Sequence, residues 1–386
     1  MRASNLQTIQ TRGGRDLIDF SVGHPSLSLL PLEIMRRACR HRLEQGDPAL
    51  LQYGYEQGSG FFRKSLAEFL ALAGGVPVDP DCLFVSNGVS QALDLLCTLH
   101  TRPGDLIFVE EPTYFLALRI FEDHGLRVAS LPVDEQGLVV EALEERLARE
   151  RPVFLYTVPT YQNPSGATLP PERRNRLVKL SEEYGFLILA DEAYHLLSYF
   201  REPPPSFGTF ASAGTVFSLG SFSKILAPGL RLGWVHARED RLRPLVKSGM
   251  LDSGGGLNPF ISALVHSVLE LGLQDTHLKK LRAVYGERLK VVCSTLSQEL
   301  PGLIHFVEPW GGFFVWVRLP DGVEARDLLP KAQRERVGFM PGTRFSSRGG
   351  MGNFMRLSFS YYDCEILREG VGRLAGVLRK EIGRQA

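Results

Sequence analysis

The chain has 386 residues, enough for two domains folded around one site. Its 44 Lys and Arg nearly balance its 43 Asp and Glu, so the charge gives no reason to expect a nucleic acid or an anionic membrane as partner, and a small molecule is expected instead. Five cysteines without CxxC spacing argue against a disulfide framework and a metal site, and no apolar run approaches the roughly 18 residues of a membrane span, so we expect a reduced, cytoplasmic setting without membrane contact.

From residue 83 onward, short apolar runs alternate with helical patterns. The runs predicted as strands are Leu83–Val85, Leu106–Val109, Val153–Val158, Phe186–Ala190 and Val216–Leu219. The helical patterns are Gln91–His100, Leu138–Arg149 and Glu172–Tyr184. This alternation is typical of strand–helix–strand units, and it predicts an α/β fold with a mostly parallel sheet. Further on, a long amphipathic helix at Thr276–Leu300 and strands at Phe313–Val317 and Met355–Phe359 indicate a second, smaller domain.

The segment after the last strand of the first group carries the strongest chemical signal. Ser221, Ser223 and Lys224 stand at the end of this strand, and Arg231 follows shortly after. A lysine becomes a Schiff-base nucleophile when burial or neighbouring cations lower its pKa, and hydroxyls with a guanidinium suit a phosphate. Taken alone, Lys224 would more often be a solvated surface lysine.

Two other strands end in polar residues that suit the same chemistry. Asp191 ends a buried strand at the edge where ligands of open α/β sheets bind, and its carboxylate could keep a pyridinium nitrogen protonated. An isolated acid at this place is also a common helix N-cap. Asn163, in Asn-Pro-Ser-Gly, could bond a phenolate oxygen, although these residues also favour an ordinary turn.

Two weaker signals lie earlier in the chain. Ser90 and Gln91 open a helix directly after a strand, and free N–H groups at a helix N-terminus bind anions. Any strand-to-helix turn carries Gly and Ser, so this signal alone is weak. Tyr114, just past a strand end, could stack on a flat ring or be a half-buried aromatic.

In this order, the motifs resemble the class I/II aminotransferases of fold-type I, particularly the branch with aminoadipate and kynurenine aminotransferases. The resemblance runs from about Asp19 to the C-terminal helix and rests on Leu51–Gly54 with Gly58, Asn87–Gln91, Asn163–Gly166, Asp191–Tyr194, Ser221–Lys224, Arg231–Gly233 and Arg356–Phe359. It implies a large domain at residues 46–280, with a seven-stranded-type, mostly parallel sheet flanked by helices. Residues 1–45, which also reach the substrate pocket, and residues 281–386 would form a smaller α+β domain.

The resemblance also implies pyridoxal 5′-phosphate (PLP) as the cofactor. Lys224 would carry it as a Schiff base and move a proton between the substrate Cα and the cofactor C4′. Asp191 would bond the pyridinium nitrogen, Tyr114 would stack on the ring, and Asn163 with Tyr194 would bond the 3′-oxygen. The phosphate would be held by Ser90, Gln91, Ser221, Ser223, Arg231 and, from a second subunit of a homodimer, Tyr53.

On the substrate side, the resemblance assigns the α-carboxylate to Arg356, assisted by Asn163, and places Gly23 beside the substrate. The implied activity is transamination by a ping-pong mechanism, from an L-amino acid to a 2-oxo acid, with 2-oxoglutarate as the default acceptor. The residues after Gly23, Ser26–Leu30, include no arginine, which favours an apolar, aromatic or otherwise uncharged amino donor.

Two other functions stay open at this point. The same scaffold and lysine serve β-lyases, racemases, decarboxylases and oxidases. The fold also serves as a ligand-sensing domain in transcriptional regulators, although the few residues before Ser21 and the neutral charge favour an enzyme. Outside the motifs, we predict a solvated helix face for the Arg173–Arg174 pair, and for His195 a structural role is about as plausible as general-base catalysis.

Overall fold

The computed structural model describes residues 16–382, so the first part of the predicted 1–45 segment and the last four residues lie outside it. None of its helices is long and apolar enough to cross a membrane. Within the same range, His, Cys, Asp and Glu nowhere form a group of three suited to a metal ion.

The central part of the chain forms a large sheet. Its strand order is β2-β9-β8-β7-β6-β3-β4-β5. The strands are β2 Leu83–Ser86, β3 Leu106–Glu111, β4 Arg127–Asp134, β5 Gly137–Leu138, β6 Phe154–Thr157, β7 Leu187–Asp191, β8 Val216–Ser221 and β9 Gly233–His236. The five central strands β8, β7, β6, β3 and β4 are parallel, whereas β9 and the short edge strand β5 are antiparallel to their neighbours. The predicted mostly parallel α/β sheet is confirmed.

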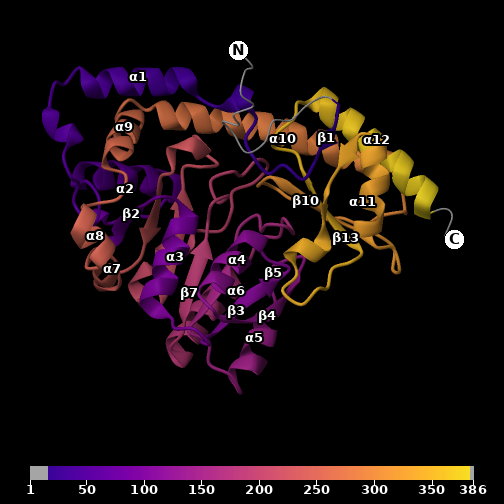
Figure 1. Cartoon of the computed structure of the whole chain (residues 1–386), viewed down its shortest axis with the longest axis horizontal. Coiled ribbons are helices and arrows are strands. Elements are labelled where there is room, and N and C mark those ends of the chain that lie inside the picture. Colours follow the sequence, from indigo (N-terminus) through magenta and orange to yellow (C-terminus); the bar gives the residue numbers. More distant parts are fainter. Residues whose placement is uncertain (1–15, 383–386) are drawn as a thin grey trace, which may run out of the picture.

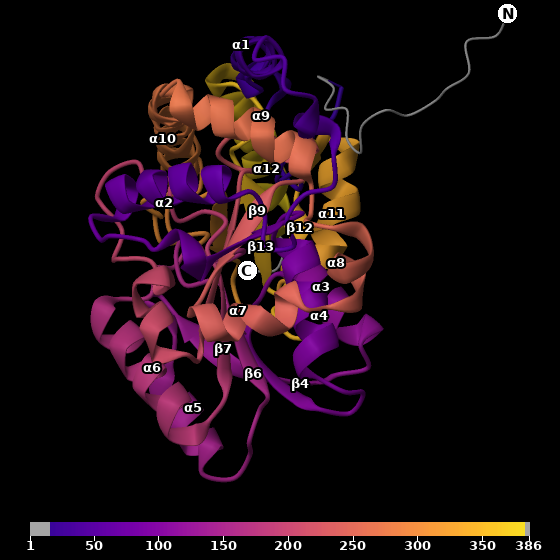
Figure 2. The ribbon, with the colours of Figure 1, turned by 90° about the vertical axis from the view of Figure 1, so that its left-hand side faces the viewer.

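Helices cover both faces of this sheet (Figure 2). One face packs against α3 Val89–His100, α4 Phe115–Asp123 and α7 Glu239–Val246, and the other packs against α5 Val140–Leu147 and α6 Pro171–Tyr184. Because side chains alternate along a strand, Tyr156 of β6 lies in the first core and its neighbour Leu155 in the second. The same alternation decides which side chain at each strand end faces the site.

A smaller antiparallel sheet stands beside the large one (Figure 1). It consists of β10 Phe314–Arg318, β13 Phe354–Ser358 and β12 Met340–Pro341, with α10 Leu273–Glu299, α11 Ala325–Arg334 and α12 Cys364–Ile382 around it. Near the start of the described chain, β1 Ile18–Asp19 pairs with β11 Val337–Gly338, far away in sequence. The domain boundaries at residues 45 and 280 stay predictions.

The remaining α-helices lie before the first strand and after the last strand of the large sheet in the sequence. They are α1 Leu32–Leu43, α2 Gly60–Gly74, α8 Gly249–Gly254 and α9 Pro259–Glu270. Helix α1 lies along one end of the molecule, where it contacts α9 (Figure 1). Short 3-10 turns at Pro48–Leu51 (η2) and Phe207–Ala213 (η4) belong to the loops that connect these elements.

The prediction of a solvated face for the Arg173–Arg174 pair is wrong for one of the two residues. Arg173 pairs with Asp134 at 2.6 Å near the surface of α6. Arg174 is only 1% exposed and points toward the sheet. Neighbouring positions on a helix are about 100° apart, so packing, and not sequence, decides which of two adjacent arginines faces the core.

Candidate active site

The predicted site residues meet at the carboxyl ends of three neighbouring parallel strands. Asn163 follows β6, Asp191 ends β7, and Lys224 follows β8. The register aligns these ends, since Tyr156 lies opposite Leu189 and Asp191 lies opposite Leu219. Ligands of open parallel sheets bind at this edge. Arg356, from β13 of the smaller sheet, reaches the same place and donates to Asn163.

The Asp191 carboxylate is buried and held on both of its oxygens. Oδ1 accepts a hydrogen bond from the Ala193 N–H at 3.1 Å, and Oδ2 accepts one from the Tyr156 hydroxyl at 2.9 Å. Burial raises the pKa of Asp191 to about 6, although the bond from Tyr156 acts in the opposite direction. A positively charged ring nitrogen beside this carboxylate would relieve that desolvation.

The Lys224 amine faces the N-terminal segment of the chain. Its Nζ donates to the carbonyl of Gly23 at 3.0 Å and lies 5.9 Å from the centre of the Tyr194 ring. Burial, reinforced by the charge of Arg356, lowers the pKa of Lys224 to about 8. A larger share of this amine is therefore unprotonated near neutral pH than of an ordinary lysine, as a Schiff-base nucleophile requires.

Arg356 is the buried cation of the site. Nη1 donates to Asn163 Oδ1 at 2.9 Å and Nη2 to the Ser21 carbonyl at 2.8 Å, while the buried Nε has no partner among residues 16–382. The guanidinium lies over the rings of Phe314 and Phe345, at 4.0 and 4.9 Å from their centres. Burial lowers the pKa of Arg356 to about 10, so it stays charged at neutral pH.

Gly23 leaves little room beside this cation. A Cβ at Gly23 would lie 3.0 Å from the Phe314 ring and 3.8 Å from Arg356 Nη2. A side chain at this position would therefore press on the aromatic ring that carries the guanidinium. Gly23 therefore lies next to Arg356, while contact of either residue with a substrate stays a prediction.

Two tyrosines complete the buried end of the site. Tyr194 follows β7 and packs edge-on against Phe313 and Phe314. Tyr114 stands at the start of α4, where burial and the charge of Asp191 raise its pKa to about 12. Both hydroxyls therefore stay protonated at neutral pH and can donate hydrogen bonds. Ring stacking by Tyr114 and bonding of a 3′-oxygen by Tyr194 stay predictions.

Three of the predicted phosphate ligands line an open groove at the other end of the site. Ser90 and Gln91, in the first turn of α3, share it with Arg231. Arg231 donates to Ser223 Oγ at 3.5 Å and to the Asn87 carbonyl at 3.2 Å, and no carboxylate among the described residues pairs with it. Ser221 accepts from the Ser223 N–H at 3.0 Å, which holds the turn before Lys224.

Glycines make this groove possible. Gly88, the residue before α3, has a φ of 89°, and a Cβ there would lie 3.4 Å from Arg231 Nη2. A Cβ on Gly233 would meet the Gly220 carbonyl at 2.5 Å and the Cα of Gly88 at 2.8 Å. The backbones of β8, β9 and the α3 turn therefore approach closely, which brings the helix N–H groups and the arginine to one anion site.

Three predicted phosphate ligands, Ser221, Ser223 and Tyr53, are not among the groove-lining residues. Ser223 still accepts from Arg231, whereas Tyr53 lies after the 3-10 turn at Pro48–Leu51 and is 79% exposed. The contribution of Tyr53 from a second subunit stays a prediction.

Sequence reasoning missed Tyr156, the residue that bonds Asp191. An aromatic in an apolar strand is indistinguishable from a core residue by sequence alone, and only the register with β7 brings its hydroxyl to the carboxylate. It also missed Phe345, which packs against Arg356 from the 3-10 turn before β13. No signal in the sequence marks that residue.

The donor set fits PLP. The site offers a lysine amine with a lowered pKa, a buried carboxylate, and an anion groove with a helix N-terminus and an unpaired arginine. These groups match the aldehyde carbon, the ring nitrogen and the phosphate of that cofactor. The unpartnered, buried Nε of Arg356 leaves a donor for a further anionic group.

Comparisons with known proteins agree with this geometry. The chain matches the family described as aminotransferase class I and II over residues 15–374. It is 34% identical to aromatic-amino-acid aminotransferase 1 of Thermococcus litoralis, over 99% of this chain and 93% of the relative.

Two solved structures are similar over nearly the whole chain. The multiple substrate aminotransferase of Thermococcus profundus superposes with a TM-score of 0.90 at 34% identity, over 96% of this chain and 93% of that one. The α-aminoadipate aminotransferase of Thermus thermophilus, complexed with N-(5′-phosphopyridoxyl)-L-leucine, has a TM-score of 0.86 at 34% identity, over 96% and 94%. The chain belongs to the class I and II aminotransferases of fold-type I, and it is a PLP-dependent transaminase.

Proposed function

We propose that the protein transfers the amino group of an L-amino acid with an aromatic or otherwise uncharged side chain to a 2-oxo acid, with 2-oxoglutarate as acceptor, by a ping-pong mechanism. The observation that carries this proposal is one site in which the Lys224 amine has a lowered pKa beside the Asp191 carboxylate and the Arg356 guanidinium. Lysine and aspartate suit the cofactor chemistry, while the arginine suits an α-carboxylate.

When bound, PLP supplies an electron sink for the charge that develops at the substrate Cα. Lys224 Nζ would hold the cofactor and, once the substrate amine has displaced it, would be free to move the proton between Cα and C4′. Asp191 keeps the ring nitrogen protonated, and the Tyr156 bond keeps that carboxylate in place. Asn163 and Tyr194 donate to the 3′-oxygen, and Tyr114 lies against the ring.

At the substrate end, Arg356 grips the α-carboxylate, and Asn163 holds the guanidinium in orientation through its Oδ1. A carboxylate fixed in this way leaves the Cα–H bond free to stand perpendicular to the plane of the cofactor ring. This orientation favours proton transfer over decarboxylation. The absence of a side chain at Gly23 keeps the short distance to the Phe314 ring and the guanidinium unfilled. Proton transfer, and not loss of the carboxylate, is therefore the proposed reaction.

The preference for an uncharged donor rests on what surrounds Arg356. Phe314 and Phe345 pack on its guanidinium, and Ser26–Leu30 offer no cation for an acidic side chain. A relative with 34% identity is named as an aromatic-amino-acid aminotransferase, and a similar structure as a multiple substrate aminotransferase. The first of these names agrees with an aromatic donor.

We also propose a homodimer in which Tyr53 of each subunit reaches the phosphate groove of the other. Large apolar side chains are exposed around Tyr53, at Leu51 (78%), Tyr55 (76%) and Phe61 (79%). Large apolar side chains exposed close together in the sequence are compatible with an interface. Light scattering should give twice the chain mass. When Lys224→Ala and Tyr53→Ala chains are co-expressed and assayed at limiting PLP, one site per mixed dimer should bind the cofactor with wild-type affinity.

An absorbance spectrum of the purified protein tests the reaction. L-Phenylalanine, L-kynurenine, L-leucine, L-glutamate and L-2-aminoadipate are added one at a time without any 2-oxo acid. We expect a donor with an uncharged side chain to convert the cofactor to its pyridoxamine form and to release one equivalent of 2-oxo acid. Continuous ammonia, carbon dioxide or peroxide would instead assign another PLP reaction, and a preference for L-glutamate or L-2-aminoadipate would contradict the proposed donor class.

A further inference from the structure

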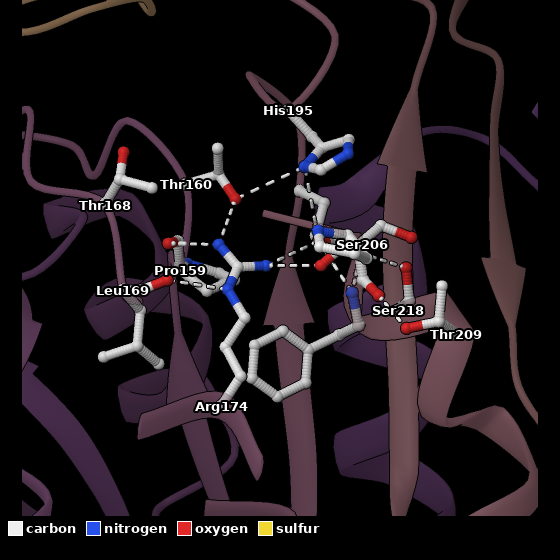
Figure 3. A network of polar contacts seen from close by, with 12 residues as sticks. Pro159, Thr160, Thr168, Leu169, Arg174, His195, Ser206, Thr209 and Ser218 are labelled. Carbon is white, nitrogen blue, oxygen red and sulfur yellow. Dashed lines mark hydrogen bonds and ion pairs between the residues drawn. The ribbon is translucent and has the colours of Figure 1, made fainter. Parts of the chain in front are cut away.

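Figure 3 shows a second polar cluster. It lies on the side of the sheet that α6 covers. At its centre is Arg174 of α6, 1% exposed. Its guanidinium donates four hydrogen bonds, to the carbonyls of Leu169 (2.7 Å), Pro159 (2.9 Å) and Pro205 (3.0 Å) and to Thr160 Oγ1 (2.8 Å). None of these acceptors carries a charge. The guanidinium therefore binds three backbone carbonyls and one hydroxyl, and no carboxylate lies within hydrogen-bond distance of it.

The four acceptors belong to two loops. Three of them lie in residues 158–170, between β6 and α6, and this loop carries Asn163 only three residues after Thr160. The fourth, Pro205, lies in the loop that follows β7 and begins at Glu192, directly after Asp191. One buried side chain therefore connects the loop that carries Asn163 with the loop that directly follows Asp191.

The nearest carboxylate completes this arrangement. Successive residues of a strand point to opposite faces, so Asp191 faces the cofactor side and Glu192 faces α6. Glu192 accepts from Ser218 Oγ at 2.5 Å and from the Phe207 N–H at 3.0 Å, and its Oε1 lies 3.9 Å from Arg174 Nη1. Glu192 is thus held by its own donors, and its charge compensates the buried guanidinium at a distance.

His195 joins the cluster from the same loop. Its Nδ1 lies 3.3 Å from Thr160 Oγ1 and 3.8 Å from Glu192 Oε1 (Figure 3). Burial lowers the pKa of His195, so it is neutral at neutral pH. The Thr160 hydroxyl therefore contacts two side chains, that of Arg174 on α6 and that of His195 in the loop after β7. This geometry gives His195 a structural role.

Only an arginine fits the place of Arg174. Its planar fork donates in several fixed directions, whereas a lysine ammonium is a compact charge with three donors. Burial lowers the pKa of Arg174 to about 10, which leaves it charged at neutral pH. Replacing it would leave buried carbonyls of the Asn163 loop without a donor, and that loop would relax.

We propose that Arg174 is a positioning residue of the transaminase: from behind the sheet it fixes the loop that holds Asn163 in the cofactor site. This inference rests on the role proposed above for Asn163, donation to the cofactor 3′-oxygen. Because Arg356 occupies Oδ1 of Asn163, the amide Nδ2 is the atom left to donate. A small rotation of the loop weakens that bond without removing any group from the site.

A double-mutant cycle on the holoenzyme tests this coupling. The pH midpoint of the absorbance change of the Lys224–cofactor linkage is measured for the wild type, Arg174→Lys, Asn163→Ala and the double variant. Donation to the 3′-oxygen favours the deprotonated linkage, so Arg174→Lys should raise the midpoint by about 0.5 to 1 pH unit. In the Asn163→Ala background, the same change should add no further shift, because the group it acts through is gone.

Two further variants keep the test decisive. Arg173→Lys changes the adjacent arginine, which pairs with Asp134 at the surface, and should leave the midpoint unchanged. Thr160→Val deletes one acceptor of Arg174 without changing any charge. Thr160→Val should raise the pH midpoint less than Arg174→Lys does, and only when Asn163 is present. If Arg174→Lys does not fold, Thr160→Val takes its place in the cycle.

The outcomes separate this inference from the function on which it rests. A lowered Tm with an unchanged midpoint and unchanged kcat/KM would make Arg174 purely structural and overturn the proposal. Additive shifts in the double variant would also overturn it, since Arg174 would then act by another route. If Asn163→Ala alone leaves the midpoint in place, the proposed role of Asn163 fails first, and the proposal for Arg174 fails with it.

Discussion

The two ends of the site are built differently. At the reacting end, Asp191 and Arg356 are buried, and protein partners hold them before any ligand arrives. At the phosphate end, Ser90 and Arg231 are exposed at an open groove, and Arg231 has no acidic partner among the described residues. Preorganised, dry groups stabilise developing charge, whereas exposed donors mainly add binding energy. We therefore expect changes at the buried end to alter turnover and changes at the open end to alter cofactor affinity.

The largest effect is expected at the buried end, from Lys224→Ala. Without the amine, no group in the site is placed to move the proton at Cα, so turnover should fall by about 10⁴-fold or more. Single-turnover absorbance with L-phenylalanine measures this loss, and Lys290→Ala, at the surface over Phe200, is the control. Retained turnover in Lys224→Ala would disprove the assignment of the nucleophile.

Arg356→Gln removes the buried charge of the same end. We expect kcat/KM to fall by about 100-fold, close to 3 kcal/mol, since a charge-assisted pair of hydrogen bonds to the α-carboxylate is lost. Steady-state kinetics with amino acid and 2-oxo acid varied in turn gives the value. Arg344→Gln, an exposed arginine near Phe115, should change it little, and equal losses in the two variants would contradict the assignment of Arg356.

At the open end, Arg231→Met should weaken cofactor binding about 10- to 100-fold, because one charged donor to the phosphate is removed. At saturating PLP, kcat should stay within a few-fold of the wild type. Equilibrium titration of the cofactor-free protein, followed by fluorescence, measures the affinity. A large fall in kcat with unchanged affinity would erase the distinction between the two ends.

Tyr156→Phe probes the residue that holds Asp191. Loss of one hydrogen bond to a buried carboxylate should lower kcat about 10-fold, or about 1.5 kcal/mol. The matched control is Tyr285→Phe, because the buried Tyr285 hydroxyl has no partner among residues 16–382. A comparable loss in both variants would indicate general destabilisation instead of support for Asp191.

The smallest expected effect is a shift in pH dependence. Only the unprotonated Lys224 amine condenses with PLP, so the rate of reconstitution should rise as the pH passes through about 8 and then level off. Arg356→Gln removes a charge that lowers this pKa, so its midpoint should lie higher, by less than about one unit. Stopped-flow absorbance measures both midpoints, and a midpoint above pH 10 in the wild type would contradict the desolvated environment of Lys224.

Much of the buried end could be predicted from the sequence. Asn163, Asp191 and Lys224 each follow an apolar run, and parallel strands bring their carboxyl ends to one edge, so strand order along the chain was enough to expect them together. The residues that hold them were not predictable in the same way. In the sequence, Tyr156 is indistinguishable from any other aromatic residue of an apolar strand. Arg174 is likewise indistinguishable from its neighbour Arg173, which lies at the surface.

Strands β4 and β9 and the two-residue strands were not predicted, and for β9 the reason is related. Four residues such as Gly233–His236 form no recognisable pattern, and their antiparallel pairing with β2 and β8 is made across long stretches of chain. The close approach of Gly88, Gly220 and Gly233 follows from that pairing. The groove for the phosphate therefore became visible only once the sheet was assembled.

By itself the sequence determined the fold class, because strand periodicity is a local property of the chain. Its motifs, through their resemblance to a known family, indicated the cofactor and the residues proposed to bind it. Only the tertiary structure decided which groups support those residues: the hydroxyl on Asp191, the aromatic rings on Arg356, and the buried Arg174 behind the sheet. Such supporting contacts join residues tens to hundreds of positions apart, and burial, which sets their strength and the pKa values, exists only after the chain has packed.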